Sequence, residues 1–219
     1  MTNINNLTRR LYDAFLLVPE GQIVLDIGAD RGLLAKALCE KEKKVYASEN
    51  KKGPYEALLK NTIIERKNNL QCIFTDGIDI LPEDVTMLSL LGMGGKTIFE
   101  ILSRHPEKLQ QIEYILIEPQ SEIDLPISFL SHNRYENVQG KYVMETRYYP
   151  LLLWKRTCAS KQLTHEEIQF GPYPLISKDE LLYEHLKNEE KRILSFPENV
   201  QLEKKNQLLL IRKGLSYYE

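Results

Sequence analysis

The chain has 219 residues, of which 42% are hydrophobic and 27% are charged, and its formal net charge is −2 at pH 7. This is enough apolar material for one ordinary domain with a core and an appendage. A net charge so close to zero excludes a global field that would attract nucleic acid or a membrane, so any polyanion must bind at a local patch. One basic run is a candidate for such a patch, with a plain solvated face as the alternative: Lys41, Lys43, Lys44, Lys51, Lys52, Arg66 and Lys67.

The sequence lacks any stretch of about 18 apolar residues. The segment 1–6 also lacks the charged-then-apolar pattern of a signal peptide. We therefore expect a cytoplasmic protein with no membrane partner. Cys39, Cys72 and Cys158 are odd in number, widely spaced and set among apolar residues. They predict buried thiols, with neither a disulfide framework nor a metal site.

Hydrophobic periodicity predicts strands and helices in alternation through the first half of the chain. The expected elements are a helix over 7–16, a strand over 23–27, a helix over 33–39, a strand over 45–49 and a helix opening at 53–55. They continue with a strand over 70–74, a strand over 85–91, a helix over about 96–104 and a strand over 114–117. Strict alternation with short connections predicts a parallel, doubly wound α/β sheet, in which ligands gather at the carboxyl ends of the strands.

Beyond residue 135 the pattern changes. The adjoining strand-like runs 137–144 and 148–154 leave no room for a helix between them, so they predict an antiparallel hairpin at the edge of the sheet. Leucines and isoleucines spaced by three and four residues over 180–194 and 200–211 predict a helical arm. We place the boundary between a ligand-binding domain, 1–156, and the arm, 157–219.

Two strand ends carry the residues that are most informative about function. The first strand ends in Asp26, Gly28 and Asp30, and the second ends in Glu49 followed by Asn50. A glycine lets backbone approach a ligand closely. Glu49 follows Asp26 at the usual spacing for a carboxylate that accepts hydrogen bonds from ribose hydroxyls. The pair indicates an adenosine-containing cofactor, with an ordinary turn carrying incidental acids as the alternative.

The same loop lacks the Gly-x-Gly-x-x-Gly pattern with which dinucleotide enzymes bind a pyrophosphate at a helix N-terminus. Asp30 stands there instead, and its charge repels a phosphate but suits an ammonium group. S-adenosylmethionine carries an ammonium and a sulfonium and no phosphate. The loop therefore favours S-adenosylmethionine as the cofactor, and a methyltransferase over a dehydrogenase.

Further motifs resemble, in the same order, those of the bacterial methyltransferases that act on N1 of adenosine 22 in tRNA. They are Asp26–Asp30, Glu49 with Gly53–Tyr55, Asp76–Gly77, Gly92–Gly95 (Gly-Met-Gly-Gly), Pro119 with a following amide, and Phe170–Pro172 (Phe-Gly-Pro). Gly-Met-Gly-Gly and Phe-Gly-Pro are the specific motifs. The resemblance implies a class I methyltransferase with a Rossmann-like sheet that ends in an antiparallel hairpin, with S-adenosylmethionine as cofactor and tRNA as substrate.

The chain departs from the family pattern at three places. The family has Asp-His, then a tyrosine and Leu-Pro, where this chain has Asp30–Leu34. The family has alanine before Gly-Met-Gly-Gly, whereas this chain has Leu91. After the fifth strand the family has Gln-Pro-Asn, whereas this chain has Glu118–Gln120. We expect cofactor binding to survive these changes and the placement of the target base to be the feature that they affect.

We assign roles to the motif residues as hypotheses. Asp26 and Asp30 hold the methionine end of the cofactor, and Glu49 accepts hydrogen bonds from the ribose hydroxyls. Asp76 accepts a hydrogen bond from the adenine amino group, and Gly77 leaves room for the adenine ring. The cofactor site is completed by Gly28, Asn50, Gly92 and Met93. Gly92–Gly95 form the floor of the pocket for the target base, and Gln120 and Asp30 are the candidate catalytic residues. An exposed amide at a strand end is the alternative for Gln120.

Three further side chains are candidates for contact with RNA. Arg31 is placed to meet a substrate phosphate, with a surface ion pair as the alternative. Tyr55 and Tyr173 are candidates for stacking on a base turned out of its helix, and an ordinary packing role is the alternative for both. The helical arm is the candidate support for the tRNA body, with a core-packing or oligomerising helix pair as the alternative.

The expected chemistry asks little of the side chains. Adenine N1 carries an unprotonated lone pair at neutral pH, so methylation needs alignment with the methyl–sulfur bond more than it needs a strong base. A carboxylate or amide oxygen nearby would stabilise the charge that develops on the base. Two other functions stay open at this point: a methyltransferase of the same fold for another RNA base or a small molecule, and a non-catalytic RNA-binding module. A monomer is favoured.

Overall fold

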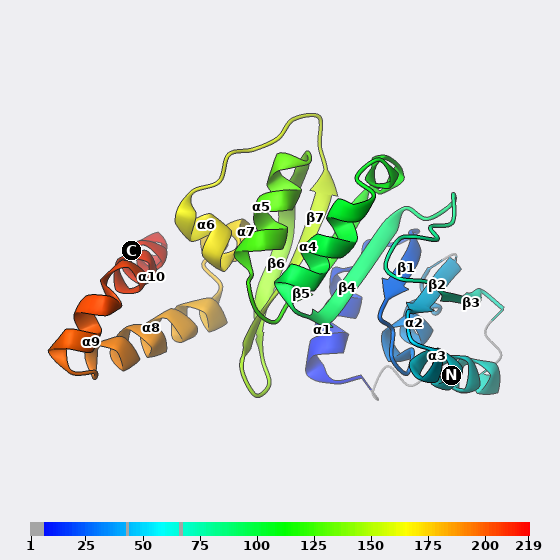
Figure 1. Cartoon of the computed structure of the whole chain (residues 1–219), viewed down its shortest axis with the longest axis horizontal. Coiled ribbons are helices and arrows are strands. Elements are labelled where there is room, and N and C mark those ends of the chain that lie inside the picture. The colour runs from blue at the N-terminus through cyan, green and yellow to red at the C-terminus, as the bar shows by residue number, and fades with distance from the viewer. Residues whose placement is uncertain (1–6, 43, 66–67) are drawn as a thin grey trace.

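The structure, a computed structural model, describes residues 7–42, 44–65 and 68–219. Its centre is a seven-stranded sheet in the order β3-β2-β1-β4-β5-β7-β6 (Figure 1). The strands are β1 (Ile23–Ile27), β2 (Lys44–Glu49), β3 (Leu70–Phe74), β4 (Met87–Met93), β5 (Tyr114–Pro119), β6 (Tyr135–Met144) and β7 (Tyr148–Arg156). Strands β1 to β5 pair in parallel, and β7 pairs antiparallel with both β5 and β6. The predicted α/β class and the closing hairpin are confirmed.

Helices cover both faces of the sheet. They are α1 (Arg9–Leu17), α2 (Leu33–Leu38), α3 (Lys52–Glu65), α4 (Gly95–Arg104), α5 (Asp124–His132), α6 (His165–Phe170), α7 (Pro172–Ile176), α8 (Glu180–Leu194), α9 (Glu198–Glu203) and α10 (Lys205–Leu215). Helices α4 and α5 lie on one face, whereas α1 and α2 lie on the other (Figure 1). Because successive strand residues point to opposite faces, β1 supplies Val24 to one apolar cluster and Leu25 to the other.

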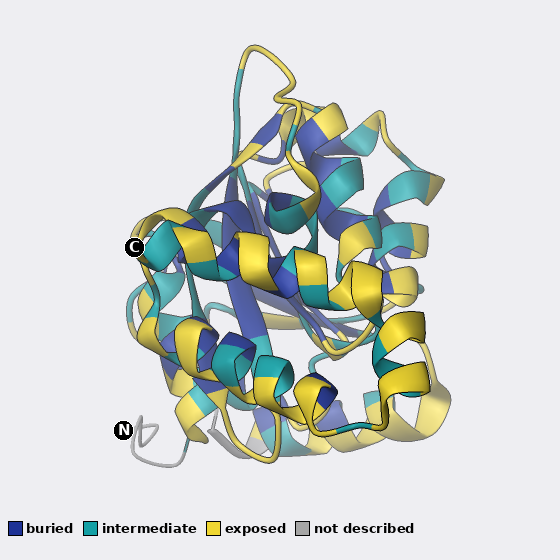
Figure 2. Ribbon diagram, turned by 90° about the vertical axis from the view of Figure 1, so that its left-hand side faces the viewer, coloured by how far each residue is buried: buried dark blue, intermediate teal, exposed yellow. Residues whose placement is uncertain are grey.

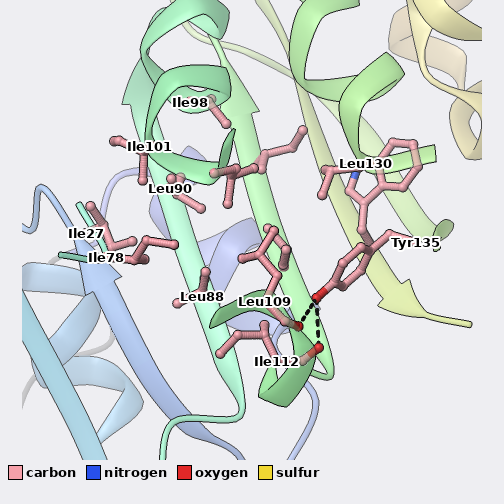
Figure 3. Packing of buried hydrophobic residues seen from close by; sticks show 14 of the residues in the cluster. Ile27, Ile78, Leu88, Leu90, Ile98, Ile101, Leu109, Ile112, Leu130 and Tyr135 are labelled. Carbon is pink, nitrogen blue, oxygen red and sulfur yellow. Dashed lines mark hydrogen bonds between the residues drawn. The ribbon is translucent and has the colours of Figure 1, made fainter. Parts of the chain in front are cut away.

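The apolar cluster under α4 and α5 is the larger of the two. Figure 3 shows part of this cluster, with Tyr135 hydrogen-bonded beside Leu109 and Ile112. The ring of Tyr135 is buried there, and its hydroxyl shares its one proton between the carbonyls of Leu109 (2.9 Å) and Ile112 (2.8 Å). A buried phenol needs such a partner, because an unpaired hydroxyl in an apolar environment is costly. These bonds tie the edge strand β6 to the short 3₁₀ segment Lys108–Gln111 before β5.

The alternation of strands and helices is less strict than the sequence indicated. The segment 75–86, all of it described, connects β3 to β4 by turns and without a helix, and β4 spans Met87–Met93 where 85–91 was expected. Instead of a helix, the connection places the buried side chain of Ile78 in the core. The correction matters for the site, because β4, shifted two residues along the chain, includes Gly92 and Met93.

Three helices were not predicted, α5, α6 and α7. Pro126 falls in the first turn of α5, where its missing N–H costs no hydrogen bond, so it does not break the helix. A capping box starts α6: the hydroxyl of Thr164 accepts from the Glu167 N–H, and the Glu167 carboxylate accepts from the Thr164 N–H. The helix expected over 200–211 is two helices, α9 and α10.

The arm shares a core with the hairpin. Helix α8 packs against α10 and β6, and the ribbon in Figure 2 is coloured by residue burial, with buried and exposed residues along the same helices. The buried members of this cluster are Tyr142, Phe170, Leu175, Leu182, Leu186, Ile193 and Ile211. Since Tyr142 belongs to β6, the arm buries part of the strand that ends the sheet. A boundary between 1–156 and 157–219 stays a prediction.

The cysteines are less buried than expected. Cys39 and Cys72 are partly buried, and Cys158 is exposed. Cys158 lies in the irregular segment that follows β7, outside the core strands, which corrects the prediction of a buried thiol there. Among the residues described, no helix has the length and apolar character needed to cross a membrane.

Candidate cofactor site at the carboxyl edge of the sheet

Two cavities adjoin at the carboxyl ends of the central strands. The first, here called the Arg10 cavity, measures about 240 Å³, and its lining includes Arg10, Asp26, Gly28, Asp30, Arg31 and Gly92. The second, here called the Asp76 cavity, measures about 340 Å³, and its lining includes Gly28, Glu49, Asn50, Asp76, Gly77 and Met93. Every residue predicted to bind cofactor therefore lines one or both cavities, and Gly28 lines both.

Gly28 lies where the two cavities meet, and its backbone conformation requires a glycine. Its φ is +70°, a conformation that L side chains rarely adopt, and a Cβ there would lie 3.2 Å from Cε of Met93. Its N–H donates to the carbonyl of Ser48 (2.9 Å), which fixes the loop to the end of β2. The two cavities therefore meet at a residue that has no side chain.

The two aspartates of the loop differ in environment. Asp26, at the end of β1, is only 5% exposed, and burial raises the pKa of its carboxyl to about 7. Asp30 has a φ of +49°, and its N–H donates to Oε1 of Glu49 (2.7 Å). This bond joins the loop after β1 to the end of β2. A cationic group in the Arg10 cavity would therefore meet one carboxylate from the end of β1 and one from the loop that follows it.

A hydrogen-bonded network orders the Asp76 cavity. The two carboxylate oxygens of Asp76 accept from Nδ2 of Asn50 (2.9 Å) and from Nη1 of Arg104 (2.8 Å). The Arg104 guanidinium and the Asn50 amide hold the pKa of the Asp76 carboxyl below its usual range, so the group is ionised at neutral pH. Each carboxylate oxygen has a second lone pair, which leaves Asp76 free to accept from a ligand. Sequence reasoning missed Arg104, because nothing local links it to Asp76.

Two glycines have other roles than the sequence suggested. Gly77 lines the cavity, but a Cβ on it would lie 2.8 Å from Cγ2 of Ile101, so its missing side chain makes room for α4 where a ligand ring was expected. Gly95 packs against backbone: its Cβ would lie 2.1 Å from the carbonyl oxygen of Glu122. Gly92 alone among the four residues of Gly-Met-Gly-Gly is exposed, with a φ of +73°. The expectation that Gly92–Gly95 form one open floor is therefore wrong for Gly95.

Gln120 lies beside that open glycine. Its backbone N–H donates to the carbonyl of Met93 (3.0 Å), and its exposed side chain places Nε2 3.9 Å from where a Cβ of Gly92 would be. The amide therefore stands at the rim above Gly92. A planar group lying on Gly92 would come within reach of it.

A buried ion pair supports the same rim, and sequence reasoning missed it. Nη1 of Arg10 donates to Oε2 of Glu118, whose side chain is completely buried, and the same oxygen accepts from the Gly92 N–H (3.0 Å). Burial raises the pKa of the Glu118 carboxyl, and the Arg10 guanidinium opposes that shift. Glu118 was visible as a departure from the family pattern, but its partner lies 108 residues away in α1. Only the docking of α1 on the sheet brings the two together.

The candidates for RNA contact are spread over the molecule. Arg31 lines the Arg10 cavity and is exposed. Tyr55 packs on the exposed ring of Phe74, with centroids 5.2 Å apart, and Tyr173 lies on α7 against β6. Tyr55 is therefore near the strand ends, and Tyr173 is not.

The basic run is divided among different environments. The ammonium group of Lys41 donates to the carbonyls of Phe15 and Val18, and that of Lys44 pairs with Asp84 at 3.0 Å. Lys51 and Lys52 are exposed beyond the end of β2, and the remaining three members, Lys43, Arg66 and Lys67, lie outside the described residues. Among the residues described, no group of three or more side chains is arranged to hold a metal ion.

Comparison with known proteins places the chain in a family. Residues 7–152 match the family model described as a methyltransferase domain. The chain belongs to this methyltransferase family. A curated relative from Mycoplasma pneumoniae, named "Putative tRNA methyltransferase", is 30% identical over 68% of this chain and 70% of its own length. The methyltransferase fold that the motifs indicated is confirmed.

Solved structures of similar proteins agree with this membership over nearly the full chain. A Streptococcus agalactiae protein of the NADB-Rossmann superfamily has a TM-score of 0.87 and 26% identity, with 96% of this chain and 97% of that chain covered. A Streptococcus pneumoniae protein described as a "putative tRNA (m1A22) methyltransferase" in complex with S-adenosyl-L-methionine has a TM-score of 0.86 and 23% identity, with 95% and 99% covered. The methyltransferase fold therefore includes the arm, since the alignment reaches well past the residues of the family model.

Proposed function

We propose that this methyltransferase transfers a methyl group from S-adenosylmethionine to N1 of adenosine 22 in tRNA. The observation that carries the proposal is the pair of cavities joined at Gly28, with acids on one loop and an open glycine, Gly92, at the rim. The name of the Mycoplasma relative, a putative tRNA methyltransferase, supports tRNA as the substrate, and that of the Streptococcus pneumoniae protein, a putative tRNA (m1A22) methyltransferase, supports the position.

The residues of the two cavities suit this cofactor. Asp26 and Asp30 supply carboxylates for an ammonium, Glu49 supplies one for the ribose hydroxyls, and Asp76 supplies an acceptor for the adenine amino group. Two cavities that adjoin at a glycine match a ligand with a nucleoside half and an amino-acid half. When bound, S-adenosylmethionine supplies an electrophilic methyl group on a sulfonium.

The protein's own task is then to place the target base. The open face of Gly92 accepts a planar ring, and the Gln120 amide at the rim hydrogen-bonds its edge. The amide oxygen of Gln120 and the carboxylate of Asp30 stabilise the positive charge that methylation puts on the ring. Turning the base out of a folded RNA costs a few kcal/mol, which contacts of the tRNA body with the arm would offset.

The deciding experiment is transfer of labelled methyl from S-adenosylmethionine to unmodified tRNA transcripts. We expect N1-methyladenosine in the digested product, mapped to position 22, and no label in a matched transcript with guanosine at that position. Label at another base would replace the substrate assignment with the same-fold alternative. Cofactor binding with no transfer to any tRNA would leave a small-molecule substrate, and absence of cofactor binding would leave the RNA-binding module.

The buried carboxyl of Asp26 makes cofactor binding depend on pH. Its pKa of about 7 means that below pH 7 a proton must leave before the carboxylate can pair with an ammonium. We therefore expect the affinity to rise with pH from 5.5 to 7.5, by at most about tenfold per pH unit, and to level off above. Titrating S-adenosylhomocysteine at several pH values tests this, and Asp26→Asn should bind more weakly with a flat profile. A slope that persists in Asp26→Asn would assign the proton to another group.

A further inference from the structure

The turn between β6 and β7 lies beyond the carboxyl edge of the sheet, and none of the roles assigned so far uses it. Pairing between β5 and β7 ends at Ile117 and Leu152, whereas β6 and β7 stay paired as far as Met144 and Tyr148. The hairpin therefore continues for four residues of β7 past its last pair with β5, or about 13 Å at about 3.3 Å per residue. Figure 1 shows the turn as the yellow-green loop that extends past the lower end of the sheet. Residues 144–148 are here called the hairpin tip.

An ion pair holds the hairpin tip beside the rim of the cavities. Nε of Arg10 lies 3.6 Å from Oε2 of Glu145, and Nη1 of the same side chain donates to the buried carboxylate of Glu118. Nη1 also lies 3.4 Å from where a Cβ of Gly92 would be. One guanidinium therefore separates the hairpin tip from the open glycine on which the target base is proposed to lie.

The other side of the hairpin tip is fixed to the arm. The ring of Tyr148 packs on the imidazole of His185 in α8, with ring centroids 4.9 Å apart, and its hydroxyl accepts from Nδ2 of Asn188 (3.4 Å). The hairpin tip is therefore held from the rim and from the arm before any RNA binds. A contact element that is ordered in advance loses little conformational entropy on binding.

The hairpin tip presents one cation and one apolar side chain to a partner. The charge of Glu145 is paired with Arg10, whereas the guanidinium of Arg147 is exposed and has no hydrogen-bond or ion-pair partner in the described part of the chain. Met144 is 46% exposed. A guanidinium binds a phosphate through two parallel N–H groups, and a flexible thioether chain packs on the face of a ring. The backbone and bases of an RNA strand present both kinds of group to such a surface.

We infer that the hairpin tip is a contact surface for RNA, in which Arg147 binds a backbone phosphate and Met144 packs against a nucleotide next to the target base. The inference rests on the proposed function and adds the element that orients the RNA at the rim. The net charge of the chain is −2, so the attraction for a polyanion has to come from local contacts of this kind. A phosphate contact sets the register of the strand without reading its sequence, which leaves recognition of the base to the rim.

Salt dependence separates these contacts from a general effect on the fold. The experiment is titration of an unmodified tRNA transcript into the full chain, with S-adenosylhomocysteine present, at several salt concentrations. In Arg147→Gln we expect the affinity to fall about three- to tenfold and the slope of log K against log salt to become shallower by about one, because fewer counterions are released. In Met144→Ser we expect a loss of about two- to fivefold with an unchanged slope, since an apolar contact releases no counterion.

Arg134→Gln is the matched control, because Arg134 is also exposed and lies in the turn before β6, at the opposite end of the same hairpin. It should leave the tRNA affinity and the slope unchanged, and all three variants should bind S-adenosylhomocysteine as the unaltered chain does. Unchanged tRNA affinity in Arg147→Gln, or an equal loss in Arg134→Gln, would overturn the inference and leave the proposed function in place. If the unaltered chain bound S-adenosylhomocysteine but no tRNA, the proposed substrate would fail together with the inference, which is a distinguishable outcome.

Discussion

Gly95→Ala is expected to destabilise the folded protein by about 3 kcal/mol, at the upper end of the cost of overpacking. A Cβ at this position would lie 2.1 Å from the carbonyl oxygen of Glu122 and 2.5 Å from that of Ser121. Both obstacles are backbone atoms, so no side-chain rotation relieves the contact. The N–H of Gly95 also donates to the carbonyl of Ser121 (2.8 Å), and this bond would be lost if the start of α4 moved away from the segment after β5.

Urea unfolding measures the effect, and Gly53→Ala is a matched control. Gly53 lies in the first turn of α3, and no described heavy atom stands within 4 Å of its Cβ position. Its substitution should change the free energy of unfolding by no more than about 1 kcal/mol. A loss for Gly95→Ala as small as that of the control would show that the loop after β5 yields easily. The start of α4 would then be less rigidly placed than the structure indicates.

Glu49→Ala is expected to weaken the binding of S-adenosylhomocysteine by about 1–3 kcal/mol, or about 5- to 150-fold. We propose that this carboxylate holds two ribose hydroxyls, and it also accepts from the Asp30 N–H (2.7 Å). Removing it would both delete ligand contacts and loosen the loop that carries Asp30. Calorimetric titration at constant pH gives the dissociation constant directly.

Glu100→Ala serves as the comparison, because Glu100 lines the same Asp76 cavity from α4 and is exposed. Its removal should change the dissociation constant by less than about threefold, as expected for a solvated carboxylate. If Glu100→Ala were the more damaging substitution, the ribose would lie against α4, and Glu49 would leave the site. Equal affinity in Glu49→Ala and the unaltered chain would also contradict the assignment.

The elements that sequence reasoning found and those that it missed differ in a physical way. Strand β3 and helix α8 have the predicted bounds, since their periodicity is strong and their ends carry clear signals. Helix α5 was missed because Pro126 resembles a helix breaker unless its place in the first turn is known. The sequence indicated strict alternation of strands and helices, and the connection over 75–86, which has turns and no helix, departs from it. It places the buried side chain of Ile78 in the core, a contact that no local pattern encodes.

The same division holds for the candidate site. Asp26, Gly28, Glu49 and Asp76 follow strands that periodicity identifies, and the carboxyl ends of parallel strands meet at one edge. Their convergence could therefore be predicted. The roles of Gly77 and Gly95 could not be predicted, because each glycine makes room for a segment that comes more than twenty residues later in the chain. Ile101 packs against Gly77, and the backbone of Glu122 packs against Gly95.

The sequence by itself determined the parallel sheet with its closing hairpin, the set of acids at its carboxyl edge and the family motifs. These follow from side-chain periodicity and from residue types at strand ends, which are properties of short segments. Only the tertiary structure decided that Arg10 meets Glu118, that Arg104 meets Asp76 and that Gly92 stays open while Gly95 does not. Each of these depends on how α1 or α4 docks on the sheet. That docking results from burying many apolar side chains together, so it cannot be derived from any one segment alone.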